Sequence, residues 1–262
     1  MMHSHMNHAN FAALEIAVGI IAAVALCLYL SAMLISNRKY SKWKASRYFW
    51  WVLGIIFAAS ALSGPLAELS HDNFIAHMVG HLLLGMLAPL LIVFSRPMML
   101  LMRTLPVQTA KRVSHLLNSR YVKFITNPTA AAILNIGGLY LLYMTDLFTL
   151  MHTSLWLYAL VHLHVFLAGY LFTISIIYTD ITTHRYSFIY RGIVLVLALG
   201  FHKVLSKLIY AHPPGSILKT EAETGAMLMY YGGDIIDLML IIILCYQWYR
   251  STAPKPGKAR PI

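Results

Sequence analysis

Seven long apolar stretches constrain the fold of this chain more than any other feature of its sequence. Each is close to the roughly 20 residues that an α-helix needs to cross a hydrocarbon core of about 30 Å. They cover residues 11–35, 47–66, 74–94, 128–150, 154–178, 187–211 and 224–249. Because hydrocarbon cannot hydrogen-bond to the backbone, such stretches cross a membrane as helices. The sequence therefore predicts an all-α fold, a polytopic membrane bundle of seven transmembrane helices.

The composition excludes several other classes of protein. Only 11% of the 262 residues are charged and 59% are hydrophobic, whereas a soluble domain has about 25% charged residues. An ordinary soluble enzyme, a disordered chain and a secreted disulfide scaffold are therefore excluded. Cys27 and Cys245 lie far apart inside apolar runs and form no C-x-x-C pair. Any metal chemistry must then use His, Met, carboxylate or Tyr side chains.

The distribution of basic residues predicts the orientation in the membrane. If the seven stretches alternate in direction, 17 of the 20 Lys and Arg residues fall on one side. The positive-inside rule makes that side cytoplasmic, so the amino terminus lies outside and the carboxyl terminus in the cytoplasm. We therefore expect a multi-pass protein of a bacterial cell (plasma) membrane. The net charge of +11 does not indicate nucleic-acid binding, because the basic residues form short clusters between apolar runs.

The chain divides into a membrane domain and three polar segments. Residues 11–250 form the membrane domain, and within it residues 95–127 form a basic, amphipathic cytoplasmic connector. Residues 251–262 are a Pro- and Lys-rich cytoplasmic tail. Residues 1–10 form an extracytoplasmic leader rich in His and Met, a composition that binds metals but also suits a simple polar leader. Its candidate metal-capturing residues are His3, His5, Met6 and His8.

Histidine is unusually abundant and unevenly distributed. Thirteen His residues outnumber the nine acidic residues, and the predicted topology places eleven of them outside or in the outer half of the membrane. His77 and His81 are four residues apart, so both rings project from one helix face toward one metal ion or proton path. The alternative is a pair of rings that hydrogen-bond within the bundle. A polar residue in a lipid span is costly and is often functional.

Other candidate residues lie in the last three apolar stretches. His162 and His164 are about 200° apart on a helix, so only one faces a shared interior. His202 and Lys203 follow in the next stretch, and the last one carries Tyr230, Asp234 and Asp237.

We expect Lys203 and Asp234 to form a buried ion pair. In the alternative, an acid of this group orients a metal-bound imidazole through its second N–H group, with Tyr230 as a further donor. Copper(I) accepts imidazole and thioether ligands, and several Met residues accompany these histidines.

These segments resemble the Bacillus-type CtaG family of cytochrome c oxidase assembly factors, which is distinct from the single-span copper chaperone of the same name. The similarity covers about residues 47–250. It rests on HMVGHLLLGMLAPLLIVFSRP (77–97), HLHVFLAGYLFTISII (162–177), KLIYA (207–211) and above all GAMLMYYGGDIIDLMLIIILCYQWYR (225–250). The turn DITTHR (180–185) lacks the prolines of the family pattern.

The resemblance implies a non-catalytic protein that is needed to make an active haem–copper oxidase and that takes part in supplying its copper. Its partners are then oxidase subunits or other assembly factors, together with the lipid bilayer, and a homo-oligomer stays open. Carried onto this chain, the family pattern selects the stretch 230–234 and the residues His77, His81, His162, His164 and Asp146.

Three hypotheses follow. The leading one is an assembly factor that binds copper from the outer side through His77 and His81, completed by His162 or His164 and by His202. The second is a haem-binding membrane protein in which two of these imidazoles ligate the iron. The third is ion or proton transport along Lys203, Asp234 and Asp237. No enzyme is expected, because the sequence contains no recognisable nucleophile–base pair, phosphate loop or metalloprotease motif.

Overall fold

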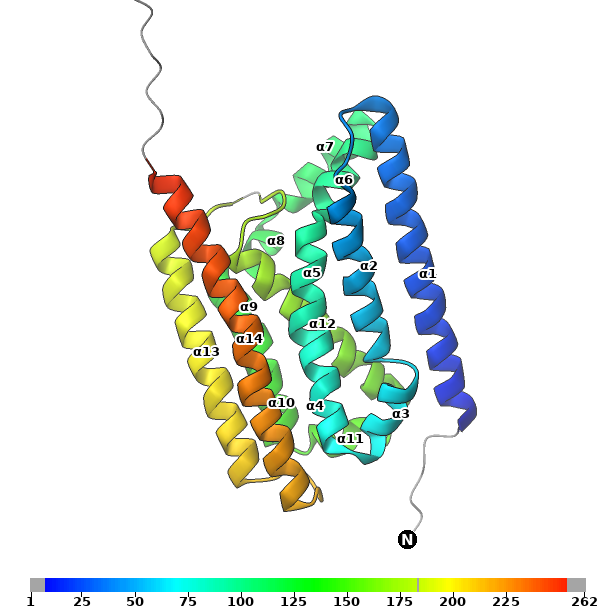
Figure 1. Cartoon of the computed structure of the whole chain (residues 1–262), viewed down its shortest axis with the longest axis vertical. Helices are drawn as coiled ribbons and strands as arrows, with labels where there is room; N and C mark the ends of the chain where they lie inside the picture. The colour runs from blue at the N-terminus through cyan, green and yellow to red at the C-terminus, as the bar shows by residue number, and fades with distance from the viewer. Residues whose placement is uncertain (1–7, 183, 254–262) are drawn as a thin grey trace, which may run out of the picture.

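The computed structural model describes residues 8–182 and 184–253, and every regular element within these ranges is helical (Figure 1). The all-α prediction is therefore confirmed for the described part of the chain. The long unbroken helices are α1 (His8–Lys39), α2 (Ala45–Ser60), α12 (Leu155–Ile176), α13 (Phe188–Ala211) and α14 (Lys219–Thr252). One further long segment is interrupted by a π-helical turn and consists of α4 (Phe74–Leu82), η1 (Leu83–Leu87) and α5 (Ala88–Ser95).

Shorter helices complete the bundle and connect its long members. A second interrupted segment consists of α9 (Pro128–Ala132), η2 (Ile133–Gly137) and α10 (Gly138–Met144). The connecting helices are α3 (Pro65–Asp72), α6 (Pro97–Thr104), α7 (Val107–Leu117), α8 (Arg120–Ile125) and α11 (Leu147–Met151).

Six segments of the described chain are long and apolar enough to cross a membrane. They are Ala12–Lys39, Ala45–Asp72, Phe74–Thr104, Leu155–Ile176, Phe188–Ala211 and Lys219–Thr252. The remaining predicted span, 128–150, which is the fourth along the chain, is a shorter apolar helix, Pro128–Met144. It ends early because the chain turns at Thr145 before α11 begins. The chain is therefore a helical protein with six candidate membrane-spanning segments and one shorter apolar helix.

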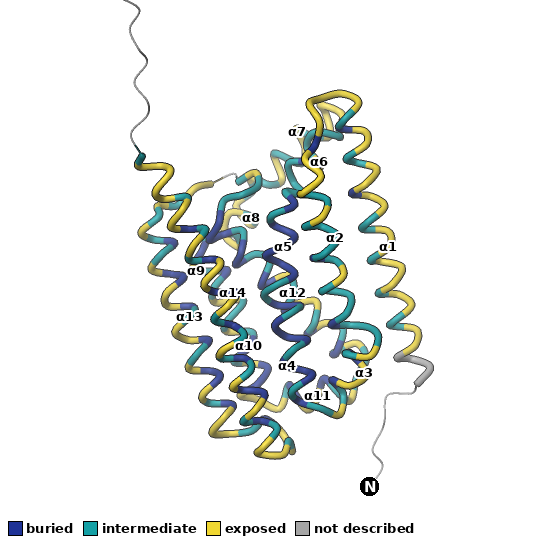
Figure 2. The backbone as a smooth tube through the Cα atoms, viewed as in Figure 1, coloured by how far each residue is buried: buried dark blue, intermediate teal, exposed yellow. Residues whose placement is uncertain are grey.

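The segment α4–η1–α5 lies at the centre of the bundle. In its most apolar window 67% of the residues are buried, against 6% for α1, and Figure 2 shows the same contrast between these two segments. The side chain of Asn73 begins α4 by accepting the backbone N–H of Ala76 at 2.9 Å. Pro89 lacks the N–H that would bond to the Gly85 carbonyl in an α-helix, and the π-helical turn lies just before it.

A close helix contact fixes α12 against this central segment. A Cβ atom added at Gly169 of α12 would overlap the carbonyl oxygen of Gly85. Only glycine permits this approach of two backbones, and the contact holds α12 against η1 and α5.

The two ends of the bundle differ in chemistry. We call the end that carries α6, α7 and α8 the basic end, and the end that carries α3 and α11 the histidine end (Figure 1). Fourteen of the seventeen described Lys and Arg residues lie at the basic end. Among the histidines within the described ranges, only His115 and His184 lie at that end.

The connector 95–127 forms three short helices, α6, α7 and α8, instead of one amphipathic helix. Proline explains the break, because Leu105 before Pro106 is extended (ψ 147°) and α7 starts only after the proline. Ser119 then begins α8 by accepting the backbone N–H of Val122. Large apolar side chains remain exposed beside basic residues along the connector, among them Val107, Leu116, Tyr121 and Phe124.

Asp180, in the turn between α12 and α13, caps α6. Its carboxylate accepts backbone N–H groups from Met98 at 2.7 Å, from Met99 at 2.8 Å and from Ile181 at 2.7 Å. Burial raises the pKa of the Asp180 carboxyl above its ordinary value, and the three N–H bonds oppose this rise. The turn that lacks the family prolines thus ties two parts of the basic end together.

Candidate functional site

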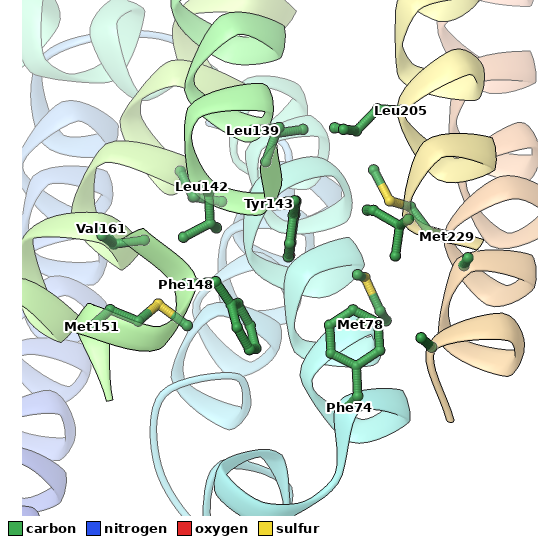
Figure 3. Close-up of a cluster of buried hydrophobic side chains, with 14 residues drawn as sticks. Phe74, Met78, Leu139, Leu142, Tyr143, Phe148, Met151, Val161, Leu205 and Met229 are labelled. Atoms are coloured by element: carbon green, nitrogen blue, oxygen red, sulfur yellow. The ribbon is translucent and has the colours of Figure 1, made fainter. Parts of the chain in front are cut away.

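Apolar and aromatic side chains from separate segments converge at the histidine end (Figure 3). Phe74 and Met78 come from α4, Tyr143 from α10, and Phe148 and Met151 from α11. Helices α12, α13 and α14 close the cluster with Val161, Leu205 and Met229. The histidines described below lie within or beside this dry environment, where an unpaired polar atom is costly.

His77 is held by aromatic neighbours and one hydrogen bond. Its side chain is 6% exposed, and its Nε2 atom lies 3.0 Å from the Tyr143 hydroxyl oxygen. The ring stacks on Phe74 at a centroid distance of 6.0 Å and meets the edge of Phe148 at 5.1 Å. His77 is therefore fixed in position at the centre of the cluster.

Two further imidazoles flank His77, each with its ring centroid 6.4 Å away. They are His152, just after α11, and His162 of α12. In each, Nδ1 lies 2.8 Å from the carbonyl oxygen four residues earlier, in Phe148 and Tyr158 respectively. A carbonyl only accepts, so Nδ1 carries the proton and Nε2 keeps the lone pair with which imidazole binds metals.

His81 and His202 form a second pair one helical turn further into the bundle. Their rings are stacked at a centroid distance of 6.2 Å and are 6% and 4% exposed. Both Nε2 atoms are buried without a hydrogen-bond partner, a condition that asks for a physical explanation in any folded protein. The two rings line one pocket together with Gly85, Met86 and Asp237, and we call it the inner pocket.

Met86 is a potential ligand that the spacing of residues did not reveal. It lies in η1, five residues after His81, and both side chains reach the same pocket. A Cβ atom added at Gly233 of α14 would lie 3.0 Å from His202 Cε1 and 3.9 Å from Met86 Cε. The Met86 methyl group and the His202 ring therefore both lie beside Gly233 of α14. A π-helical turn is frequent at functional sites, and Pro89 was the only sign of it in the sequence.

Two residues selected from the family pattern, His164 and Asp146, line neither this pocket nor the small cavity beside His77. His164 is exposed, and its Nε2 lies 3.1 Å from the carbonyl oxygen of Leu134 in η2. Gly138 leaves room for this ring, because a Cβ atom there would collide with it. Of the two α12 histidines, His162 thus faces the cluster and His164 ties α12 to η2. Asp146 is exposed just before α11.

The charged residues of α13 and α14 form the expected ion pair, but it is not buried as predicted, because the two side chains are 31% and 41% exposed. Lys203 donates to the Asp234 carboxylate, and its Nζ lies 4.3 Å from the centre of the Tyr230 ring. Asp237 is 4% exposed and lines the pocket that contains His81 and His202. The ion pair is satisfied without any ligand, whereas the two imidazoles beside it are not.

The candidate metal-capturing tract is only partly covered. His3, His5 and Met6 lie outside the described residues, and His8 is the first residue of α1.

A soft monovalent metal ion fits the donors of the inner pocket. Within the described ranges, no three His, Cys, Asp or Glu side chains converge on one metal position. Two imidazoles and one thioether do line a single pocket, and these are ligands that copper(I) accepts. An ion shared between two facing imidazoles separates their centroids by about 6 Å, given metal–nitrogen distances of about 2.0 Å. The His81 and His202 centroids are 6.2 Å apart, so the two rings are close enough for one ion to reach a nitrogen of each.

Sequence comparison relates these residues to a known family. The profile of the family described as cytochrome c oxidase caa3 assembly factor (Caa3_CtaG) matches residues 27–251. The chain belongs to this family. The matched range contains both histidine pairs, Met86 and the ion pair, and the resemblance seen in the sequence is confirmed.

The comparison with curated proteins adds one distant relative of this CtaG-family chain. An uncharacterized protein of Mycobacterium leprae is 24% identical, in an alignment that covers 88% of this chain and 39% of the relative. This chain thus spans about two fifths of that relative's length. No solved structure matches the chain.

Proposed function

We propose that this CtaG-family protein assists the assembly of a haem–copper cytochrome c oxidase by holding copper(I) at His81, His202 and Met86 and passing it to the oxidase core. One observation carries the proposal. Two buried Nε2 atoms lack hydrogen-bond partners and share a pocket with a thioether. The protein acts without catalysis of its own, and its partners are oxidase subunits or other assembly factors.

The physical reason is the cost of unpaired polar atoms in a dry interior. A buried acceptor or donor without a partner costs about 1–3 kcal/mol, and two of them face one pocket here. Binding copper(I) removes this cost, because the ion accepts the lone pairs that the pocket leaves unused. The empty site is therefore less stable than the occupied one, and this difference in free energy favours binding of the ion.

We further propose that the chain crosses a bacterial plasma membrane seven times. The helix Pro128–Met144 packs against α12 and α13, and its 17 residues reach the lower limit of about 17–25 for a transmembrane helix. The concentration of Lys and Arg at the basic end favours a cytoplasmic location for that end. The histidine end then faces outward, with the amino terminus outside and the carboxyl terminus inside.

Copper loading of the purified protein tests the proposal. We expect wild type to retain about one copper(I) per chain after removal of excess metal, and His81→Ala/His202→Ala to retain almost none. His164→Ala is the matched control, because its ring bonds to η2 and lies outside the pocket. In cells, oxidase copper content should fall with the double variant and not with the control. Equal copper retention by the double variant and wild type would contradict the proposal.

The same preparation separates copper from haem, the second hypothesis drawn from the sequence. A Soret band with sharp bands on reduction would assign the imidazoles to haem iron. We expect purified protein without added copper to be colourless.

A further inference from the structure

The paired imidazoles of the proposed copper site continue as a series toward the histidine end. His71, in the last turn of α3, has its ring centroid 6.0 Å from that of His152. His152 in turn lies 6.4 Å from His77, and His77 lies 6.4 Å from His162. The separations repeat the 6.2 Å found between His81 and His202.

The series connects to the inner pocket through α4. His77 and His81 are one helical turn apart, and with His162 and Tyr143 they line one small cavity. His81 also lines the pocket that contains His202 and Met86. His81 is therefore shared between two cavities, one also lined by His77 and His162 and one that holds the proposed copper ligands.

The orientation of the flanking rings suits temporary ligands. Backbone carbonyls hold the Nδ1 protons of His152 and His162, so each ring presents the lone pair of Nε2 to its surroundings. His152 is only partly buried and follows α11 at the histidine end. Exposed acids of α3, Glu68 and Asp72, lie at the same end and raise the local concentration of cations.

We propose that His71 and His152 receive copper(I) at the histidine end, and that His77 and His162 pass it to His81 by exchange of one imidazole at a time. This inference rests on the proposed function and adds a route of access to it. At each step the ion gains one imidazole nitrogen and releases another, and at His77 it displaces the Tyr143 hydroxyl from Nε2. No bare cation therefore enters the apolar interior, and no redox change is needed. His71, His77, His152 and His162 are transfer ligands, while His81, His202 and Met86 hold the ion.

Rapid-mixing kinetics test this route. Purified full-length protein is mixed with the coloured copper(I)–bicinchoninate complex, and the loss of that colour as copper leaves the chelator gives the rate of uptake. Metal analysis at equilibrium gives the amount bound. We expect His152→Ala to slow uptake, because the ion loses a ligand on its path, with the equilibrium copper content unchanged. His164→Ala should change neither quantity.

A second substitution at position 152 guards against a purely structural effect. His152→Met supplies a thioether that binds copper(I) and should restore much of the wild-type rate, whereas His152→Phe fills the space without a ligand and should not. Uptake by His152→Ala at the wild-type rate, or equal rates for His152→Met and His152→Phe, would overturn the route and leave the copper site intact. Failure of wild type to bind copper would instead refute the proposed function.

Discussion

The two ends of the bundle treat buried polar groups differently. At the basic end, Asp180 accepts three backbone N–H groups. Arg191, which is 1% exposed, donates to the Ile176 carbonyl at 2.5 Å and lies over the Tyr178 ring. Two atoms there, Ser36 Oγ and Arg191 Nε, have no partner, but each charged group is anchored through its other atoms. These charged groups of the basic end are therefore bonded within the protein.

At the histidine end two imidazole nitrogens are unsatisfied, and the Tyr158 hydroxyl is also buried without a partner. His81 and His202 each leave Nε2 unpaired beside the thioether of Met86. Other imidazoles at this end do have hydrogen-bond partners, since His77 bonds to the Tyr143 hydroxyl and His162 to the Tyr158 carbonyl. The difference indicates that one end is built for rigidity and the other for exchange with a ligand. The following predictions test this distinction.

The largest expected effect comes from Gly169→Ala. The added Cβ atom overlaps the Gly85 carbonyl oxygen, so α12 must move away from η1. We expect a loss of about 3 kcal/mol in unfolding free energy, measured by thermal unfolding in detergent, together with loss of copper retention. Gly192→Ala in α13 is the control, because nothing lies within 4 Å of its new Cβ atom, and it should leave both properties intact. An unaffected Gly169→Ala protein would show that the contact does not position the site.

The ion pair separates stability from metal binding. Asp234→Ala leaves Lys203 unpaired within a membrane helix, and we expect it to cost about 2 kcal/mol in stability while copper retention stays at the wild-type level. The double variant Lys203→Met/Asp234→Leu should recover most of the stability, because it removes both charges. Loss of copper from the double variant with normal stability would place the ion pair in the metal site and break the distinction.

Met86→Leu should weaken copper(I) binding with little change in folding. The substitution keeps the volume and removes the sulfur, so we expect a stability change under about 1.5 kcal/mol. Copper(I) affinity should fall by about tenfold, or about 1.4 kcal/mol, in competition with a chelator. Met78→Leu is the matched control, since Met78 is fully buried in the apolar cluster and does not line the pocket. Equal affinities of the two variants would remove Met86 from the ligand set.

The smallest effect concerns pH at the basic end. Because burial raises the pKa of Asp180 in the folded protein, the folded state binds its proton more tightly than the unfolded state. Wild type should therefore lose stability relative to Asp180→Asn as pH rises from about 4, the ordinary carboxyl value, through the raised one. Thermal unfolding of both proteins across this range measures the difference. A stability difference between the two proteins that stays constant with pH would show that Asp180 does not titrate in this way. Copper binding should be equal in both proteins at every pH.

Much of the architecture could be predicted because span length and helical periodicity are local properties. The apolar runs gave the long helices, and the 100° step per residue placed only one of His162 and His164 in the cluster. The charge pattern likewise predicted the Lys203–Asp234 pair. The span 128–150 was predicted too long, because apolar residues continue past Thr145 into α11, beyond the turn that ends α10.

The remainder depends on tertiary packing and on local departures from α-helical geometry. Met86 reaches the pocket through a π-helical turn, which an α-helical projection of the sequence places elsewhere. His71 and His152 lie at the ends of the short helices α3 and α11, where no periodic pattern indicates their direction. Their proximity follows only from the packing of two segments that are distant in sequence.

X-ray absorption at the copper edge of the loaded protein tests the central claim most directly. We predict copper(I) bound by two imidazole nitrogens at about 2.0 Å and one sulfur at about 2.3 Å, with the imidazole signal reduced in His202→Ala and the sulfur signal lost in Met86→Leu. Copper bound without imidazole, or a spectrum that neither substitution changes, would contradict a site at His81, His202 and Met86.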